Sequence, residues 1–306
     1  MRTVVLAGGT GGAKLAAGFQ ALMAPGDVTV IANTADDDEF WGLLVCPDVD
    51  ATIYRLAGVF DDGLGYGQKG DTFNTLEALG RLGEPTWFRI GDRDLATHVL
   101  RAQMLDSGCR LTETAVELCR RFALATRVLP MTDDKVRTRF VTDRGTLSFQ
   151  EYFVREHLAP ALQSIDISGG DSAAPSPEST AALVDADVVI IGPSNPLISI
   201  APIIKVLGTQ LHRERTVAVT PIVGGAALKG PTVEMFRALG FDATPREVAR
   251  MYAPVAGTFV VDSRDAAAAG EIEAMGYRVI VCDTVMADGG AGLAGSILEA
   301  LPAPLR

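Results

Sequence analysis

The chain has 306 residues, of which 48% are hydrophobic and 21% are charged, and its 27 Lys and Arg against 38 Asp and Glu give a net charge of −11. This composition is typical of a folded globular protein and excludes a disordered one. The excess of acid argues against a nucleic-acid partner, because binding a phosphate backbone needs a basic face. An acidic protein that handles anionic substrates must neutralise them locally, with a metal ion, backbone amides or a few placed cations.

The cysteines and the apolar runs point to the cytoplasm. The four cysteines include no CxxC pair, which argues against a zinc knuckle or redox motif and suits a reducing compartment. The first apolar run, Val4 to Ala7, is too short for a signal peptide. The longest apolar stretch, Val188 to Val206, is broken by glycine, prolines and polar residues. We therefore predict a cytoplasmic protein with no membrane partner.

A βαβ unit opens the chain. A β-branched strand at 3–7 is followed by a glycine cluster, a helix from about Gly12 to Phe19 and a second strand at 27–32. Downstream we expect helices at 47–56, 72–82, 95–105 and 113–122, a strand at 86–90, an antiparallel excursion at 128–153 with a turn at Arg144-Gly145, and a loop at 169–179.

The βα alternation then returns, with strands predicted at 187–191, 216–219, 258–262 and 278–281 and helices at 231–239, 245–251 and 266–275. Parallel strands joined by crossover helices imply a sheet covered on both faces. The prediction is an α/β fold with a Rossmann-like, doubly wound, mostly parallel sheet. It forms one domain over residues 1–306, with a less regular inserted subdomain at about 52–165.

The sharpest motif directly follows the first strand. Glycines let a backbone turn tightly and approach a ligand, and a helix N-terminus suits phosphate. The motif matches neither the P-loop nor GxGxxG, and a second strand ending in Asn33 lacks the acidic residue of a nicotinamide site. We predict a nucleotide diphosphate site, and the alternative is a tight turn without a ligand. Its residues are Gly8, Gly9, Thr10, Gly11, Gly12 and Lys14, with Asn33 beside them.

The second motif is acidic. Asp36 and Asp37 lead a run of four acids after the second strand, and Asp48 and Asp50 follow in CPDVD. Ligands of open α/β sheets lie beyond the carboxyl ends of strands, and Mg²⁺ is usually held by one or two carboxylates with substrate phosphates. We predict Mg²⁺ here. The alternative is a solvated turn, with Asp48 as a helix cap.

A third motif, RIGDRDLATH, spans Arg89 to His98 at a predicted strand end, where such dense charge is unusual for a plain loop. The structural alternatives are Asp94 as a helix cap, an Asp92–Arg93 ion pair and His98 as a hydrogen-bonded structural histidine.

The fourth motif, GPSNPLISI, follows a buried strand. Ser194 and Asn195 are placed there to read a base, ribose or phosphate, unless the segment is only a rigid turn with Ser194 as N-cap. The loop at 220–225, with Lys229 after it, is a weaker candidate.

Taken together, the segments GGTGGAKL, NTADD, CPDVD, GDTFNT, IGDRDLATH, LPMTDD, IGPSNPLISIAPI and GPT resemble the CofD/FbiA family of 2-phospho-L-lactate transferases of deazaflavin coenzyme F-420 biosynthesis. The resemblance implies transfer of a phospho-three-carbon-acid group, phospholactyl, phosphoenolpyruvyl or phosphoglyceryl, from its guanosine diphosphate conjugate. The acceptor is the ribityl hydroxyl of the deazariboflavin Fo, and GMP leaves.

The resemblance also implies residue roles. Asp36, Asp37 and Asp50 would hold Mg²⁺, with Asp50 also at the acceptor and, beside Asp37, catalytic. Arg89 would contact the acceptor, and Lys14 and Arg93 would add positive charge. The glycine cluster would hold the donor phosphates, and Ser194 and Asn195 the guanosine. Asp38-Glu39-Phe40-Trp41 departs from the family pattern, which affects the ligand set and the shape of the pocket.

Two other functions remain as alternatives. A YvcK-like nucleotide-sugar-binding regulator shares the GGTG turn, but CPDVD and GDRDLATH favour the transferase. A nicotinamide-dependent oxidoreductase is disfavoured by the glycine spacing and by Asn33. The long middle section could supply the surface of a homodimer.

Overall fold

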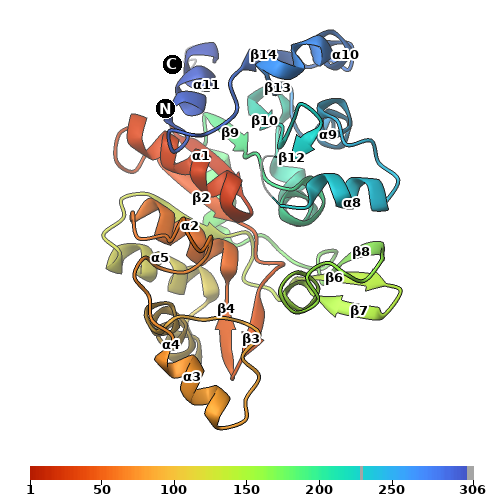
Figure 1. The fold of residues 1–306 in the computed structure, drawn as a ribbon. Coiled ribbons are helices and arrows are strands. Elements are labelled where there is room, and N and C mark those ends of the chain that lie inside the picture. The colour runs from red at the N-terminus through yellow and green to blue at the C-terminus, as the bar shows by residue number, and fades with distance from the viewer. Residues whose placement is uncertain (228–229, 302–306) are drawn as a thin grey trace.

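The computed structural model describes residues 1–227 and 230–301, and a seven-stranded parallel sheet forms its centre (Figure 1). The strands follow the order β14–β13–β10–β9–β1–β2–β5, which confirms the predicted α/β, doubly wound fold. The order reverses direction between β1 and β9, which is the position where such sheets bind ligands. The bounds are β1 Thr3–Ala7, β2 Val28–Ala32, β5 Arg127–Pro130, β9 Val188–Ile191, β10 Thr216–Val219, β13 Thr258–Asp262 and β14 Arg278–Cys282.

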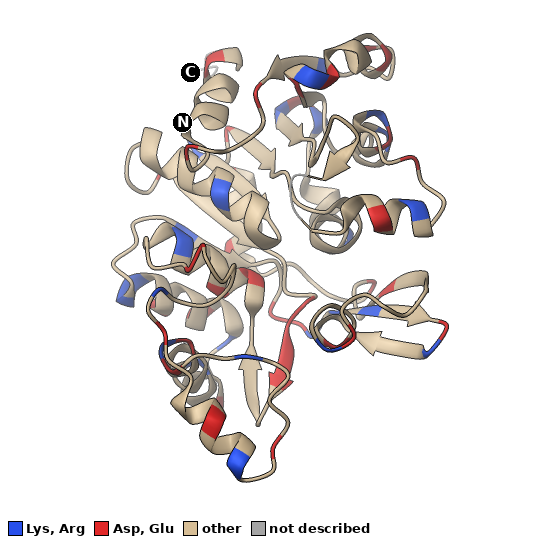
Figure 2. Cartoon of the chain, in the orientation of Figure 1, with Lys and Arg blue, Asp and Glu red and all other residues tan. Residues whose placement is uncertain are grey.

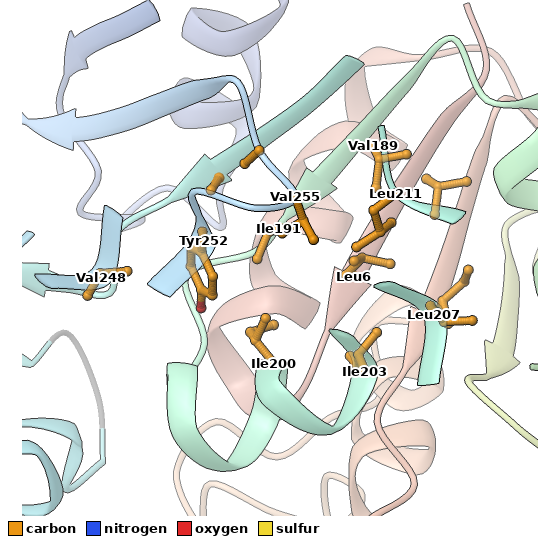
Figure 3. Packing of buried hydrophobic residues seen from close by; sticks show 14 of the residues in the cluster. Leu6, Val189, Ile191, Ile200, Ile203, Leu207, Leu211, Val248, Tyr252 and Val255 are labelled. Atoms are coloured by element: carbon orange, nitrogen blue, oxygen red, sulfur yellow. The ribbon is translucent and has the colours of Figure 1, made fainter. Parts of the chain in front are cut away.

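The central strands are continuous apolar runs because both faces of the sheet are covered. All residues of β1, β2, β9 and β10 are buried. Successive side chains of β1 point to opposite faces, so Leu6 belongs to one hydrophobic cluster and Val5 to the other. Figure 3 shows the cluster of Leu6, in which Val189 and Ile191 of the sheet pack near Ile203.

Helices cover the two faces. α1 (Gly9–Leu22), α2 (Pro47–Leu56), α5 (Leu111–Arg121) and α11 (Ala291–Ala300) contribute to the cluster that contains Val5. α6 (Pro177–Asp185), α7 (Ala201–Leu207), α8 (Thr232–Ala238), α9 (Pro245–Tyr252) and α10 (Ala269–Glu273) contribute to the cluster of Leu6. α3 (Asn74–Arg81) and α4 (Asp92–Asp106) extend away from the sheet at the lower end of Figure 1.

Three small antiparallel pieces lie outside the main sheet. A hairpin joins β3 (Asp38–Phe40) to β4 (Leu43–Val45), and another joins β11 (Ile222–Val223) to β12 (Ala226–Ala227). The third piece is an arm of three strands in the order β7–β6–β8, whose π-helical turn at Glu151–Arg155 lies next to the functional site. The strands of this arm are β6 (Arg137–Thr142), β7 (Gly145–Ser148) and β8 (Leu162–Ser168).

Most predicted elements are confirmed, and the differences have physical reasons. α1 begins at Gly9 rather than Gly12, so most of the glycine cluster is the first helical turn. The predicted strand at 86–90 is wrong: this segment is irregular, and its aromatic residues pack against the β3–β4 hairpin. β5 pairs with β2 in the central sheet, so the chain returns to that sheet within 52–165. None of the helices in the described ranges is long and apolar enough to span a membrane.

Candidate active site

A cavity of about 510 Å³ lies beside the N-terminus of α1, which directly follows β1. Five parts of the chain surround it: the start of α1, the first turns of α2, the segments around 60–67 and 87–98, and the arm. Its lining includes Gly9, Thr10, Asp48, Asp50, Tyr54, Phe60, Tyr66, Trp87, Phe88, Arg89, Asp94, His98, Gln150, Arg155 and His157.

Aromatic rings form much of the cavity wall, with Phe60, Tyr66, Trp87 and Phe88 among them. The hairpin holds two of these rings, because Phe40 of β3 stacks on Phe88 with centroids 3.8 Å apart and meets Trp87 edge-on at 5.5 Å. Phe40 belongs to the segment 38–41, which departs from the family pattern. This departure therefore supports the aromatic wall. Such a wall suits a flat aromatic ligand.

The glycine cluster divides into packing residues and one residue that faces the cavity. A Cβ at Gly8 would lie 2.5 Å from the Cβ of Ser199, and a Cβ at Gly11 would lie 2.2 Å from the carbonyl oxygen of Pro193. At Gly12 it would lie 2.7 Å from the Cα of Ala7. These glycines allow backbone segments to approach one another. Their role is the one expected for a tight turn without a ligand. Gly9, with a φ of +71°, and Thr10 line the cavity.

Asp48 binds a backbone amide of the glycine cluster, where a phosphate is predicted. The Gly9 N–H donates to Asp48 Oδ1 at 2.6 Å, and Asn33 Nδ2 donates to Asp48 Oδ2 at 3.0 Å. Burial raises the pKa of Asp48 to about 6, against these two hydrogen bonds. Asn33 thus orients a carboxylate. Lys14 is not among the residues that line this cavity.

Asp36 and Asp37 are buried, so the solvated-turn alternative is wrong for them, although acidic residues continue into exposed β3 (Figure 2). Burial and then the charge of Asp48 raise the pKa of Asp36. Burial also raises the pKa of Asp37 to about 8, although Arg137 opposes the shift. Among the described residues, Asp36 Oδ1 and both carboxylate oxygens of Asp37 have no hydrogen-bond partner.

Asp50 reaches the cavity from α2 and forms an ion pair with Arg101 of α4. The Arg101 side chain is 1% exposed, and its Nη1 also donates to the Leu44 carbonyl at 3.1 Å. Burial lowers the pKa of Arg101, but the charge and hydrogen bond of Asp50, together with Cys46 and Tyr54, outweigh burial and raise it. Asp50 Oδ1 takes the Arg101 bond, while Oδ2 has no hydrogen-bond partner within residues 1–227 and 230–301.

Asp94 and His98 lie one helical turn apart on α4, and both line the cavity. Asp94 Oδ1 accepts from the Tyr54 hydroxyl at 2.8 Å and lies 3.4 Å from His98 Nε2. Burial would raise the pKa of Asp94, but His98 and Tyr54 together hold it below its ordinary value. Asp94 is therefore part of the cavity floor rather than only a helix cap.

Asp71 and Asp92 cap each other's helices. Asp92 Oδ1 accepts from the Thr75 N–H of α3 at 3.0 Å, and Asp71 Oδ1 accepts from the Arg93 N–H of α4 at 2.7 Å. Arg93 Nη1 donates to the Lys69 carbonyl at 2.6 Å, so this arginine holds the loop that precedes α3. The sequence pattern GDTFNT…GDRD is thus a structural device, and the predicted Asp92–Arg93 ion pair is replaced by capping.

Asp92→Ala is expected to lower the free energy of unfolding, because it removes the carboxylate that caps α3. The activity of the folded fraction should stay within about twofold of wild type, because Asp92 contacts α3 rather than the cavity. Urea denaturation and steady-state kinetics measure the two effects. A large loss of turnover with unchanged stability would contradict the capping role.

Ser194 and Asn195 hold the backbone. Ser194 Oγ accepts from the Gly12 N–H at 3.1 Å, and Asn195 Oδ1 accepts from the Leu197 N–H at 2.9 Å as the N-cap of a π-helical turn. Asn195 Nδ2 faces the sulfur of Met235 at 3.4 Å. The rigid-turn alternative describes these contacts, with Asn195 rather than Ser194 as the cap. Lys229, the weaker candidate, lies outside the described residues.

The acidic residues fit a magnesium ion that is shared with a substrate. In the part of the chain that is described, no group of three His, Cys, Asp or Glu side chains is arranged to hold a metal, so Asp36, Asp37 and Asp50 are not a complete cage. Asp50 is near enough for its charge to raise the pKa of Asp37. The unpartnered oxygens of Asp36 and Asp37 fit a hard cation whose other ligands are phosphate oxygens and water.

Several residues that line the cavity, and Arg101 behind Asp50, escape prediction from the sequence. Arg101, Tyr54, Trp87 and Gln150 carry no motif spacing, and their positions depend on which elements meet. Gln150 comes from the arm and donates to the Asp36 carbonyl at 3.0 Å, which ties the arm to the acidic segment. The one sequence signal for these residues is the aromatic pair Trp87-Phe88 in an otherwise polar stretch. The sequence pattern led instead to a predicted strand at 86–90.

The fold and the cavity together define a small-molecule site of the kind that doubly wound α/β enzymes carry at the carboxyl ends of their strands. The chain belongs to the CofD family: the family described as 2-phospho-L-lactate transferase CofD matches residues 3–288. This confirms the resemblance that the motifs indicated.

Relatives and solved structures agree with this assignment. The chain is 37% identical to a 2-phospho-L-lactate transferase of Methanosarcina barkeri, with 92% of each chain covered. It is 39% identical to a phosphoenolpyruvate transferase of Kitasatospora aureofaciens, covering 94% of this chain and 93% of that one. A crystal structure of a UPF0052 family member from Bacillus halodurans shares the fold, with a TM-score of 0.61 at 15% identity over 97% of this chain and 98% of the other.

Proposed function

We propose that the protein transfers a phospho-three-carbon-acid group, phospholactyl, phosphoenolpyruvyl or phosphoglyceryl, from its guanosine diphosphate conjugate to the ribityl hydroxyl of deazariboflavin Fo. GMP is released, and the product belongs to coenzyme F-420 biosynthesis. The family match and the names of relatives support a transferase of this type. The observation that carries the proposal is the cavity, in which an aromatic wall meets a buried carboxylate floor beside α1.

The two parts of the cavity match the two parts of the acceptor. A flat deazaflavin ring would lie against Phe60, Trp87 and Phe88, where stacking and burial of apolar surface stabilise it. Its polyhydroxyl chain would extend to the floor, where Asp50 and Asp94 offer hydrogen-bond acceptors.

The donor enters the same floor from the α1 side. Gly9 and Thr10 border the cavity at the N-terminus of α1, where the helix dipole favours an anion. The other predicted donor contacts, Gly11, Gly12, Ser194 and Asn195, are engaged in packing. The Gly9 N–H is engaged by Asp48, so we place the donor phosphates beside Thr10 at the start of α1.

Asp36 and Asp37 would hold Mg²⁺ together with the donor phosphates, which leaves the free oxygen of Asp50 for the acceptor. The bound ion would neutralise charge on the diphosphate and stabilise the departing GMP. The oxygen of the acceptor hydroxyl attacks the phosphorus that bears the three-carbon acid, and the bond from that phosphorus to the bridging oxygen of GMP breaks. Asp50 Oδ2 accepts the hydroxyl proton, because its partner oxygen is engaged by Arg101.

The direct test is mass spectrometry of the products formed from Fo and each of the three guanosine diphosphate conjugates with Mg²⁺. A phosphodiester of Fo together with GMP is the expected result. Binding of UDP-sugars with no product from any donor would instead favour the YvcK-like regulator. The sequence also predicts a cytoplasmic location and a homodimer. We keep both as separate proposals.

Arg89→Ala is expected to raise the KM for Fo about tenfold and to change the affinity for GDP by less than about twofold, the loss of one charged contact on the acceptor side. Arg89 lines the cavity beside the aromatic wall, and its guanidinium lies 4.5 Å from the ring centroid of Phe73. Fluorescence titration with Fo and calorimetric titration with GDP measure the two affinities. Equal losses for both ligands would contradict an acceptor-side role.

A further inference from the structure

Two buried atoms on the cavity floor are left for a ligand. The His98 side chain is 1% exposed, and its ring lines the cavity. Within the described residues, His98 Nε2 and Asp50 Oδ2 make no hydrogen bond. A buried polar atom without a partner destabilises the fold, so a protein keeps one where a ligand or water completes it.

Arg101 determines which proton His98 carries. Arg101 Nη1 lies 3.1 Å from His98 Nδ1. A guanidinium can only donate, so Nδ1 must be the acceptor, and neutral His98 carries its hydrogen on Nε2. The same guanidinium donates through Nη2 to Asp50 Oδ1. One buried arginine therefore fixes both the tautomer of the histidine and the orientation of the carboxylate.

The result is a hydrogen-bond donor on one side of the His98 ring and the Asp50 acceptor on the other side. His98 Nδ1 lies 3.7 Å from Asp50 Oδ2, and Nε2–H lies on the other side of the ring, 3.4 Å from Asp94 Oδ1. Neighbouring hydroxyls of a polyol chain need both kinds of partner, since each hydroxyl donates one hydrogen and accepts others. An apolar or purely anionic ligand would leave one of these atoms unmatched.

We propose that His98 is a substrate-binding residue that donates from Nε2 to a hydroxyl of the acceptor chain, next to the hydroxyl that Asp50 receives, and that Arg101 is the positioning residue for both. This inference rests on the proposed function, because it assumes a polyhydroxyl acceptor. It assigns a ligand contact where the sequence favoured a structural histidine. His98 thereby sets the register of the chain, so that the terminal hydroxyl faces the donor.

Two substitutions separate the ligand contact from the structural one. In His98→Asn the shorter amide reaches only the position of Nδ1, so it can accept from Arg101 but cannot reach the ligand. In His98→Gln the longer amide reaches the position of Nε2, so it can donate to the ligand but leaves Arg101 short of an acceptor. The matched control is His212→Asn, at an exposed histidine far along the chain.

We expect one His98 variant to change mainly the KM for Fo and the other to change mainly the melting temperature. His98→Asn should raise the KM for Fo about tenfold, the value of one hydrogen bond, with a melting temperature near that of wild type. His98→Gln should raise KM less than about threefold but lower the melting temperature, and His212→Asn should change neither. Equal KM values for the Asn and Gln variants, or a normal KM for His98→Asn, would overturn the assignment.

A second measurement needs no variant. Wild-type protein should bind Fo at least about tenfold more tightly than a deazaflavin whose side chain lacks hydroxyls, by fluorescence titration. Equal binding of the two would overturn the inference while leaving transfer to Fo intact. If the wild type neither binds Fo nor forms product, the proposed function fails and this inference fails with it.

Discussion

Asp50→Asn is expected to lower the turnover of the transfer reaction by about 10²–10⁴-fold, the usual contribution of a positioned general base. It should also destabilise the fold by about 3–5 kcal/mol, because the substitution leaves the buried charge of Arg101 without its counterion. From the sequence alone we would expect this variant to fold normally. The ion pair with Arg101 changes that expectation.

A double variant separates the two effects. Asp50→Asn combined with Arg101→Met removes both charges and should recover most of the lost stability, since replacing a buried ion pair by apolar groups is often neutral. Turnover should stay low, because the proton acceptor is still missing. Urea denaturation and kinetics on the two single variants and the double variant measure this, with Mg²⁺ held constant. Recovery of turnover together with stability would show that Asp50 acts only through the fold.

Gly11→Ala is expected to cost about 3 kcal/mol or more of stability. The new Cβ would lie 2.2 Å from the carbonyl oxygen of Pro193, and neither backbone can move without disturbing β1 or the loop after β9. The KM for the donor should be unchanged in the protein that remains folded. Thermal unfolding and donor kinetics at low temperature measure both quantities.

Gly9→Ala is the matched control, two residues away. Its φ of +71° makes any side chain strained, at about 1–2 kcal/mol, but the nearest atom to the new Cβ is Asp48 Oδ1 at 3.8 Å. We expect a smaller loss of stability than at Gly11 and a raised KM for the donor, because Gly9 faces the cavity. If Gly11→Ala raised the KM for the donor more than Gly9→Ala did, the donor would lie on the Pro193 side of α1.

The sequence by itself determined the architecture of this protein. Strands such as β9, β10 and β13 are short apolar runs between turn signals, and both faces of a parallel sheet demand such runs whatever packs on them. The predicted bounds of β10 and β13 are those of the structure. Asp50, Arg89 and Gly9 were also predicted for the site, because they directly follow strands or stand in a family motif, and all three line the cavity.

Only the tertiary structure decided which charged residues do chemistry and which hold the fold. Arg93 and Asp92 look as reactive in the sequence as Asp94, yet capping between distant segments engages the first two and leaves the third on the cavity floor. Arg101 shows no motif, but it meets Asp50 across 51 residues of chain. Burial and hydrogen-bond partners depend on such long-range contacts, and local spacing along a chain carries little information about them.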